Sequence, residues 1–157
     1  MSNAKIRHWV YTAIGILILI SGCWFLLMRE SKITQESLQD TYSAHEKALQ
    51  DVASYLLAKE ASVDITGLPT IDNGYNIPVE QTQAYDAFSD GLNEVLREDF
   101  QEVIAEGDSV RFVTPKSGGL LVQNHGELAV GNAPISVNDA PRAALNGSWY
   151  YYIVKED

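Results

Sequence analysis

Residues 107–122, GDSVRFVTPKSGGLLV, decide the fold class because the hydrophobic pattern of the chain changes there. Val110 and Phe112 lie two residues apart, and Leu120 and Val122 repeat this spacing after a turn that contains Pro and Gly. A period of two is typical of a β-strand, because successive side chains point to opposite faces of the sheet. The stretch therefore predicts a β-hairpin.

Two further segments toward the C-terminus have the composition of strands. Residues 128–130 follow Asn-His-Gly, in which His125 is interpreted as a turn residue, and residues 148–154 (SWYYYIV) are rich in aromatic side chains. Between these strands, residues 138–147 predict one or two helical turns, because Asn and Asp precede Pro at the start and Asn-Gly ends the segment. The C-terminal part thus predicts an antiparallel sheet of about four strands over residues 109–155.

Two helices are expected before the sheet. Residues 33–60 contain no Gly or Pro, and residues 79–105 resume helical spacing after Pro78, with residues 97–100 as a second break within them. The loop between the helices, residues 61–79, is interrupted repeatedly by Gly and Pro. The seam of the first helix consists of Leu38, Tyr42, His45, Leu49, Val52 and Leu56, and His45 is interpreted as a partly buried core residue. Helices followed by an antiparallel sheet define the α+β class.

The strongest pattern of the chain lies near its N-terminus. Residues 9–28, WVYTAIGILILISGCWFLLM, contain no charged side chain and follow a short basic tail formed by residues 1–8. A helix of this length rises about 30 Å, which is the thickness of the hydrocarbon core of a bilayer. We therefore predict a transmembrane helix over residues 9–28, with the lipid bilayer as its partner.

Lipid attachment is an alternative for the same segment. The sequence Ile-Ser-Gly-Cys that ends at Cys23 resembles the lipobox of bacterial lipoproteins, which implies that Cys23 carries the lipid after residues 1–22 are removed. The apolar run continues over residues 24–28, whereas a polar tether usually follows the cysteine of a lipoprotein, and this favours the uncleaved helix. Both anchors place residues 29–157 outside the cytoplasm. For the helix, this orientation rests on the N-terminal amine and His8, since Lys and Arg are equally divided between the flanks.

Charge is unevenly distributed along the chain. Residues 33–157 contain 7 Lys and Arg against 20 Asp and Glu, so this part carries a net charge of -13, whereas the whole chain carries -10. A nucleic-acid partner is not expected, because such binding needs clustered basic side chains. Cys23 is the one cysteine of the chain, which excludes an intrachain disulfide and a Cys-based zinc site.

Catalytic and metal-binding motifs are not recognisable in the sequence. Residues 86–91 fail the calcium-loop pattern, because Phe88 and Arg97 occupy positions 3 and 12, where oxygen ligands are required. The chain also has neither G-x-S-x-G nor a glycine-rich phosphate loop, so no cofactor and no metal is expected. The enzymatic alternative is an envelope enzyme that uses paired carboxylates, one from the acidic stretch 94–108 and the other from Asp139.

An aromatic run in the last predicted strand is the local feature that indicates binding. On a strand, Trp149 and Tyr151 share one face. Tyr150 and Tyr152 share the other face. One pair is expected to pack under the helices and the other to contact a protein partner in the cell envelope. Alternatively, residues 131–147 cover the second face.

Taken together, these patterns predict a single-pass protein of the cell membrane with a cytoplasmic N-terminus. Residues 29–157 are expected to form an acidic extracytoplasmic α+β domain. With an anchor, an acidic surface and no catalytic motif, this domain is expected to act as a non-catalytic binding or accessory module.

Overall fold

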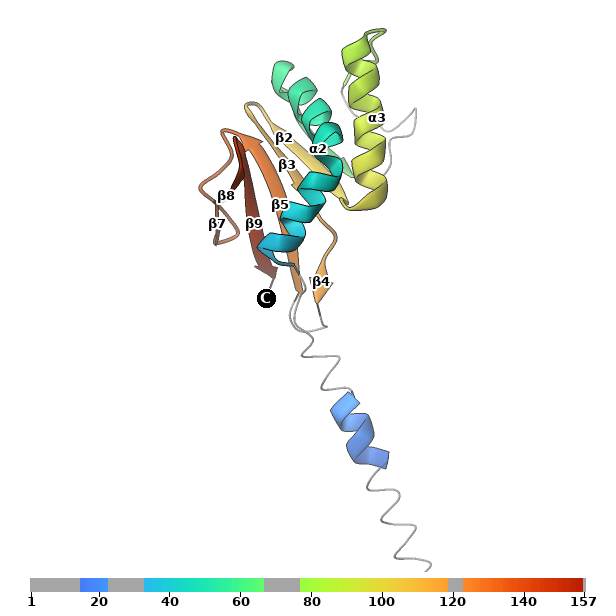
Figure 1. The fold of residues 1–157 in the computed structure, drawn as a ribbon, viewed down its shortest axis with the longest axis vertical. Coiled ribbons are helices and arrows are strands. Elements are labelled where there is room, and N and C mark those ends of the chain that lie inside the picture. The colour runs from blue at the N-terminus through green and yellow to red at the C-terminus, as the bar shows by residue number, and fades with distance from the viewer. Residues whose placement is uncertain (1–14, 23–32, 67–76, 119–122, 157) are drawn as a thin grey trace, which may run out of the picture.

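The computed structural model of the chain describes residues 15–22, 33–66, 77–118 and 123–156. It confirms the α+β class. Helices α2 (Gln35–Ala58) and α3 (Gln83–Glu98) accompany a mostly antiparallel sheet. Figure 1 shows α2 lying across one face of the sheet, with α3 beside α2. The order differs from the expected one in one respect, because a strand, β1 (Ser62–Thr66), lies between the two helices in the chain.

The sheet is larger than the four strands expected. Seven strands form it in the order β1-β2-β3-β5-β9-β8, with β4 paired to β5, and β6 and β7 form a separate two-stranded ribbon. All of these pairs are antiparallel. The strands after β1 are β2 (Glu102–Glu106), β3 (Ser109–Val113), β4 (Ser117–Gly118), β5 (Gln123–Gly131), β6 (Ser136–Val137), β7 (Ala140–Pro141), β8 (Ala143–Asn146) and β9 (Trp149–Glu156).

Helix α2 begins at a capping box and buries one stripe of side chains. Thr34 accepts a hydrogen bond from the backbone N–H of Ser37, and the Ser37 hydroxyl accepts one from the backbone N–H of Thr34. The buried stripe contains Leu38, Tyr42, Ala48, Leu49, Val52, Ala53, Tyr55 and Leu56. It includes five of the six predicted seam residues, and the sixth, His45, is partly buried. The helical period therefore identified the face that packs on the sheet.

The two helices approach closely at small residues. A Cβ atom added at Gly91 would lie 2.9 Å from the backbone oxygen of Ala48, so glycine lets α3 pack directly on the backbone of α2. Nearer the start of α3, the rings of Phe88 and Tyr55 stack with their centroids 4.6 Å apart. These contacts hold the N-terminal half of α3 to α2.

Two hydrophobic clusters lie on opposite faces of the sheet. The larger cluster is formed with the helices and includes Phe112, Leu128 and Trp149. The smaller cluster contains Ala129, Ala133, Ala140, Tyr152 and Val154, and it lies where residues 133–140 fold over the other face of β5 and β9. The central strands are therefore covered on both faces.

The second helix ends earlier than expected. It stops at Glu98, with Asp99 as its C-cap, rather than at residue 105. Phe100 is 3% exposed and fixes the turn, and after it Val103 and Ala105 are buried in alternation within β2. The helix was predicted to continue because Val103 and Ile104 extend the apolar pattern of α3. The fold instead has the break that was also predicted at residues 97–100.

Two local interpretations in the C-terminal half are wrong. His125 is not a turn residue but lies within β5, where it is 7% exposed. The expected helical turns in residues 138–147 are replaced by short strands, and Asn138 and Asp139 take positive φ values of 44° and 65° in the turn between β6 and β7. Asn and Asp suit a helix cap, and they also tolerate the left-handed region of a tight turn. The sequence was therefore compatible with a helical turn and with the turn that the fold contains.

The N-terminal apolar segment is described only in its middle, residues 15–22, which are helical. Among the residues described, no helix combines the length and the hydropathy needed to cross a membrane. The remainder of the predicted span, residues 9–14 and 23–28, lies outside the described residues, and so does Cys23.

Candidate functional site

A buried ionic network lies on the sheet face opposite the helices. Strand β3 places Arg111 opposite Ala129 of β5, which makes Arg111 a diagonal neighbour of Glu127. Its Nη1 donates to Oε2 of Glu127 over 2.9 Å, and the other carboxylate oxygen, Oε1, lies 3.2 Å from Nε2 of His125. Glu127 is only 3% exposed. The pleat thus aims three ionisable side chains at one place.

The hydrogen-bonding groups of Glu127 are more completely paired than those of Arg111. Both oxygens of Glu127 have partners, as a buried carboxylate requires. Arg111 also approaches Glu106, with 3.9 Å between Nη2 and Oε1, but its buried Nε atom has no hydrogen-bond partner. Since His125 and Glu127 are buried and engaged with each other, the network is built to hold the sheet face together.

A second acidic pair adjoins this network at the edge of the sheet. Asp64 in β1 lies opposite Ile104 of β2, so Asp64 and Glu102 are diagonal neighbours on the same face. Burial raises the pKa of Glu102, and the hydrogen bond and charge of Asp64 and the charge of Glu127 raise it further, while Arg111 lowers it. The protonated form of Glu102 is therefore favoured beside the Asp64 carboxylate.

The chemistry open to these groups is limited by where they lie. Two cavities in the described part of the chain adjoin the helices. One, of about 330 Å³, lies between α2 and α3, and the other, of about 230 Å³, lies beside Tyr55. Neither is lined by Arg111, His125 or Glu127. Within residues 15–22, 33–66, 77–118 and 123–156, no cluster of three or more His, Cys, Asp or Glu side chains could hold a metal ion.

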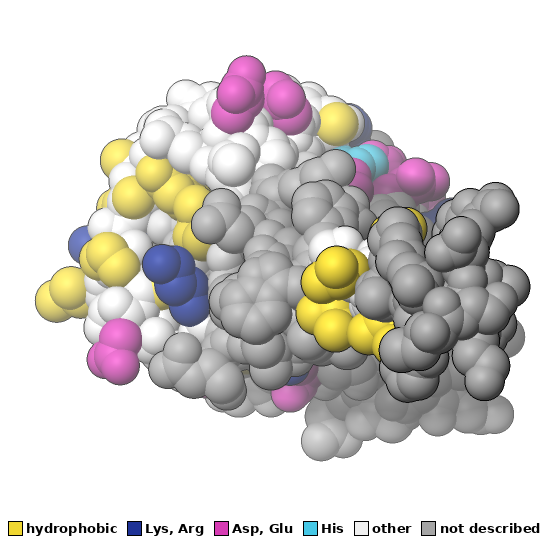
Figure 2. Space-filling view, turned by 90° about the horizontal axis from the view of Figure 1, so that it is seen from below, with side chains coloured by type: hydrophobic (Ala, Val, Ile, Leu, Met, Phe, Trp, Pro, Cys, Tyr) yellow, Lys and Arg dark blue, Asp and Glu magenta, His cyan; other side chains and the backbone are white. Residues whose placement is uncertain are grey.

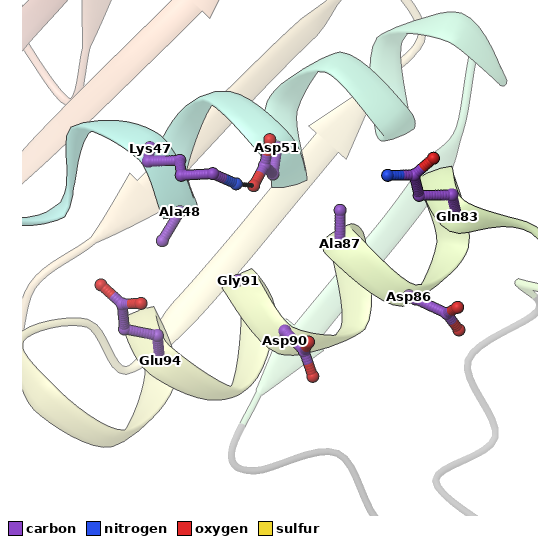
Figure 3. A pocket seen from close by; sticks show the side chains of 9 residues that line it. All are labelled: Lys47, Ala48, Asp51, Gln83, Asp86, Ala87, Asp90, Gly91 and Glu94. Atoms are coloured by element: carbon purple, nitrogen blue, oxygen red, sulfur yellow. Dashed lines mark hydrogen bonds and ion pairs between the residues drawn. The ribbon is translucent and has the colours of Figure 1, made fainter.

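The cavity between the helices is an acidic groove. Figure 3 shows Lys47 and Asp51 joined by an ion pair on α2 and Glu94 reaching from α3 toward α2. The floor is formed by small residues where the helices meet, among them Ala48 and Gly91. The complete described lining is Lys47, Ala48, Asp51, Gln83, Asp86, Ala87, Asp90, Gly91 and Glu94.

The aromatic run of β9 alternates between the two faces as predicted. Trp149 and Tyr151 belong to the cluster under the helices, and the ring of Trp149 lies 5.3 Å from that of Tyr42. Tyr152 is fully buried on the opposite face, where its hydroxyl donates to the backbone oxygen of Pro134. Tyr150 is half-buried beside it.

This arrangement matches the alternative in which both faces are covered. Trp149 and Tyr152 offer no surface to a partner in this conformation, because they are 5% and 0% exposed. Tyr150 and Tyr151 keep part of their surface accessible. Any binding through the predicted aromatic face therefore depends on Tyr150 and Tyr151 and on what surrounds them.

One exposed apolar side chain, that of Ile135, is linked through Arg142 to the half-buried Tyr150. The guanidinium carbon of Arg142 lies 4.3 Å from the centroid of the Tyr150 ring, and the backbone N–H of Arg142 donates to the backbone oxygen of Ile135. Ile135 is 82% exposed. We call these three residues the Ile135 patch. Figure 2 shows hydrophobic side chains gathered near Lys and Arg side chains at one side of the view.

The carboxylate pair proposed from the sequence is not brought together by α3. Asp139 lies in the β6–β7 turn, whose Ala140 packs on the face opposite the helices, whereas the acidic residues of α3 lie on the helical side. The network residues Arg111 and Glu127 were missed. The sequence did contain a signal for them, because each is a charged residue within an otherwise hydrophobic strand. The alternation of side chains along a strand then places both on the face opposite their hydrophobic neighbours.

Comparisons with known proteins do not assign the chain to a family. No family model, no curated protein and no solved structure matches it. The function is therefore argued from the residues themselves.

Proposed function

We propose that the chain is a single-pass membrane protein that holds a small acidic α+β domain outside the cytoplasm as a non-catalytic binding or accessory module. One observation carries this proposal. Five consecutive large apolar side chains in the helix at residues 15–22, those of residues 16–20, are each between 52% and 69% exposed. Elsewhere in the described chain, Val79 and Ile135 are the large hydrophobic residues exposed to a similar degree. A helix that is apolar on every side is stable in lipid rather than in water.

The net charge of the domain supports its placement outside the cytoplasm. Residues 33–157 carry a net charge of -13, and the cytoplasmic leaflet of a membrane is anionic. A tethered domain of that charge would be repelled by this leaflet. The N-terminal amine and His8 add positive charge to the flank that the proposal leaves in the cytoplasm.

Binding through the Ile135 patch is the second part of the proposal. Tyr and Arg are enriched in protein interfaces, where an exposed apolar anchor beside them supplies much of the binding energy. Ile135 supplies the exposed apolar anchor, and Arg142 connects it to the partly exposed Tyr150. By contrast, the buried ion pairs of His125 and Glu127 serve the stability of the sheet.

Intact mass of the protein extracted from bacterial membranes tests the anchor. We expect the full 17.4 kDa and extraction that requires detergent. Loss of residues 1–22 with the gain of a diacylglycerol group would instead establish the lipoprotein alternative at Cys23. Loss of the N-terminal segment with no lipid gained would contradict both anchors. Cleavage of the domain by protease added to intact spheroplasts then tests the side of the membrane.

Site-specific photocrosslinking in intact cells tests the module. A photoreactive residue at position 135 should give one discrete adduct, and a residue at position 54, exposed on α2, should not. Tyr150→Ala combined with Arg142→Ala should remove that adduct without lowering the amount of folded protein. Equal labelling from both positions would contradict a dedicated surface.

A second candidate function is favoured by the Asp64–Glu102 pair. The raised pKa of Glu102 is the feature expected of an envelope enzyme that uses one carboxylic acid and one carboxylate. Hydrolysis of an envelope glycan or peptide that is lost in a folded Glu102→Gln variant, but retained when Ile135 is replaced by Asp, would favour this function over binding.

A further inference from the structure

Helix α2 is interrupted at one residue, His45. Its φ of -117° and ψ of 17° are not helical, although α2 continues on both sides. The side chain reaches across to α3, where Nδ1 lies 2.9 Å from Oε1 of Glu94 and Nε2 lies 2.9 Å from Oδ2 of Asp99. The imidazole is 11% exposed, whereas the side chains of Glu94 and Asp99 are about half exposed, at 51% and 50%.

The geometry specifies the protonation state of this histidine. A neutral imidazole has one N–H group, so it donates to one carboxylate and turns a lone pair toward the other. An imidazolium has two N–H groups and donates to both. Because both nitrogens of His45 lie at hydrogen-bond distance from carboxylate oxygens, the arrangement fits the charged ring.

We propose that His45 is a pH-sensitive clasp that ties the C-terminal end of α3 to α2 when protonated and loosens this contact when deprotonated. The contacts of His45 lie toward the C-terminal end of α3. Gly91 and Phe88 hold the earlier part of α3 through close packing that does not depend on pH. Glu94 and Asp99 lie in the last turn of α3 and at its C-cap. The same end is also held by apolar packing, since Val95, Leu96 and Phe100 are 0%, 9% and 3% exposed, so deprotonation loosens the polar contacts and widens the acidic groove at Glu94 without detaching the helix.

The charges around the clasp are few and identifiable. Burial lowers the pKa of His45, but the hydrogen bonds and charges of Glu94 and Asp99 outweigh burial, so the pKa lies above its ordinary value of 6.5. On α2, Lys47 interacts with Glu94 and is itself paired with Asp51. From α3, Glu94 and Asp99 are the charged groups that face the ring. The proposal for His45 does not depend on whether the domain binds a partner through the Ile135 patch.

A nuclear magnetic resonance titration of the full chain in detergent micelles tests the clasp. With the three histidines assigned by single replacement, we expect the His45 midpoint above 6.5 in the unaltered protein and a lower midpoint in the Glu94→Gln/Asp99→Asn variant. Glu98→Gln is the matched control, because it removes a carboxylate from an exposed position of the same turn. It should leave the midpoint above that of the double variant.

Hydrogen exchange of the α3 amides gives the second measurement. Protection factors, which divide out the intrinsic exchange rate, should fall about tenfold for residues 93–98 as the pH rises through the His45 midpoint, since charge-assisted hydrogen bonds are lost. Amides of residues 86–91 should change less. In His45→Gln, the protection of residues 93–98 should not depend on pH. A midpoint at or below 6.5, or protection in the unaltered protein that does not follow the midpoint, would overturn the proposal.

Discussion

Arg111 and Glu127 join strands β3 and β5 through an ion pair of 2.9 Å on a sheet face where the Glu127 side chain is 3% exposed. A buried carboxylate is costly, and the cost is offset only while its partners stay in place. Arg111 contacts one carboxylate oxygen of Glu127, and His125 contacts the other. On this face of the sheet, the ion pair thus lies beside the smaller hydrophobic cluster, since Glu127 is opposite Tyr152.

Arg111→Met should destabilise the domain by about 3–5 kcal/mol, because it leaves the charge of Glu127 buried without its guanidinium. Replacing both partners, Arg111→Met with Glu127→Leu, should recover much of that loss, since no unpaired charge remains. Urea unfolding of the full chain in detergent measures both. Arg97→Met, at an exposed position of α3, is the control and should change the free energy of unfolding by less than about 0.5 kcal/mol. Equal losses at Arg97 and Arg111 would contradict this account.

Glu102→Gln should stabilise the domain at neutral pH by roughly 0.2–1 kcal/mol, the range for cross-strand charge pairs. The reason is the raised pKa of Glu102 beside Asp64. For a carboxyl group with a raised folded pKa, the stabilising contribution is present below its ordinary value of 4.5 and is lost as the pH rises through the folded value.

The pH dependence of the stability gain distinguishes an effect of the raised Glu102 pKa from the effect of removing any negative charge. The gain from Glu102→Gln should shrink below pH 4.5, where the natural carboxyl is protonated in both states. Glu98→Gln, with an exposed side chain on α3, is the control. A gain that is equal at acidic and neutral pH would contradict the raised pKa of Glu102.

The helical part of the fold was readable because its side chains follow one period. Leu38, Tyr42, Leu49, Val52 and Leu56 were predicted to form a seam, and all five are buried. Strand β1 was not recognised, since its residues stand in a segment with frequent Gly and Pro and its pairing with β2 spans a whole helix. Such long-range pairing leaves little local signal.

The candidate site was harder to predict than the fold. Arg111 and Glu127 are 16 residues apart, and only the register of β3 against β5 brings them together. His45 was recognised as partly buried, but its two carboxylate partners lie 49 and 54 residues away on another helix. Periodicity identifies the face of an element, whereas a site depends on which faces meet.

Gly126 illustrates how a correct local pattern led to a wrong element. The sequence Asn-His-Gly was interpreted as a turn, yet Gly126 lies inside β5 under the start of α2. A Cβ atom at this position would lie 2.5 Å from Cδ2 of Leu38. The glycine is required for close packing of helix on sheet, and not for a turn.

Gly126→Ala should therefore cost about 1–3 kcal/mol through overpacking against Leu38. The matched test is a double-mutant cycle with Leu38→Val, which shortens the clashing side chain. The double variant should lose less stability than the two single losses combined, because the valine makes room for the added methyl group. Strict additivity in urea unfolding would show that the loss at Gly126 does not arise from this contact.

The stability of the domain should also fall as the pH rises past the titration of His45. The folded pKa of His45 is raised above 6.5 by Glu94 and Asp99, so its contribution is fully present below 6.5 and is lost as the pH rises through the folded value. We expect a loss of about 1–2 kcal/mol over this window, in the range of a charge-assisted hydrogen bond. Urea unfolding of the unaltered chain and of His45→Gln across this window measures it. The two curves should converge at high pH, because a neutral imidazole and an amide are both uncharged. If they stay a constant distance apart at every pH, the ion pairs of His45 contribute nothing that titrates, and the helix interface is held by packing that does not depend on pH, including that of Phe88, Gly91 and Val95.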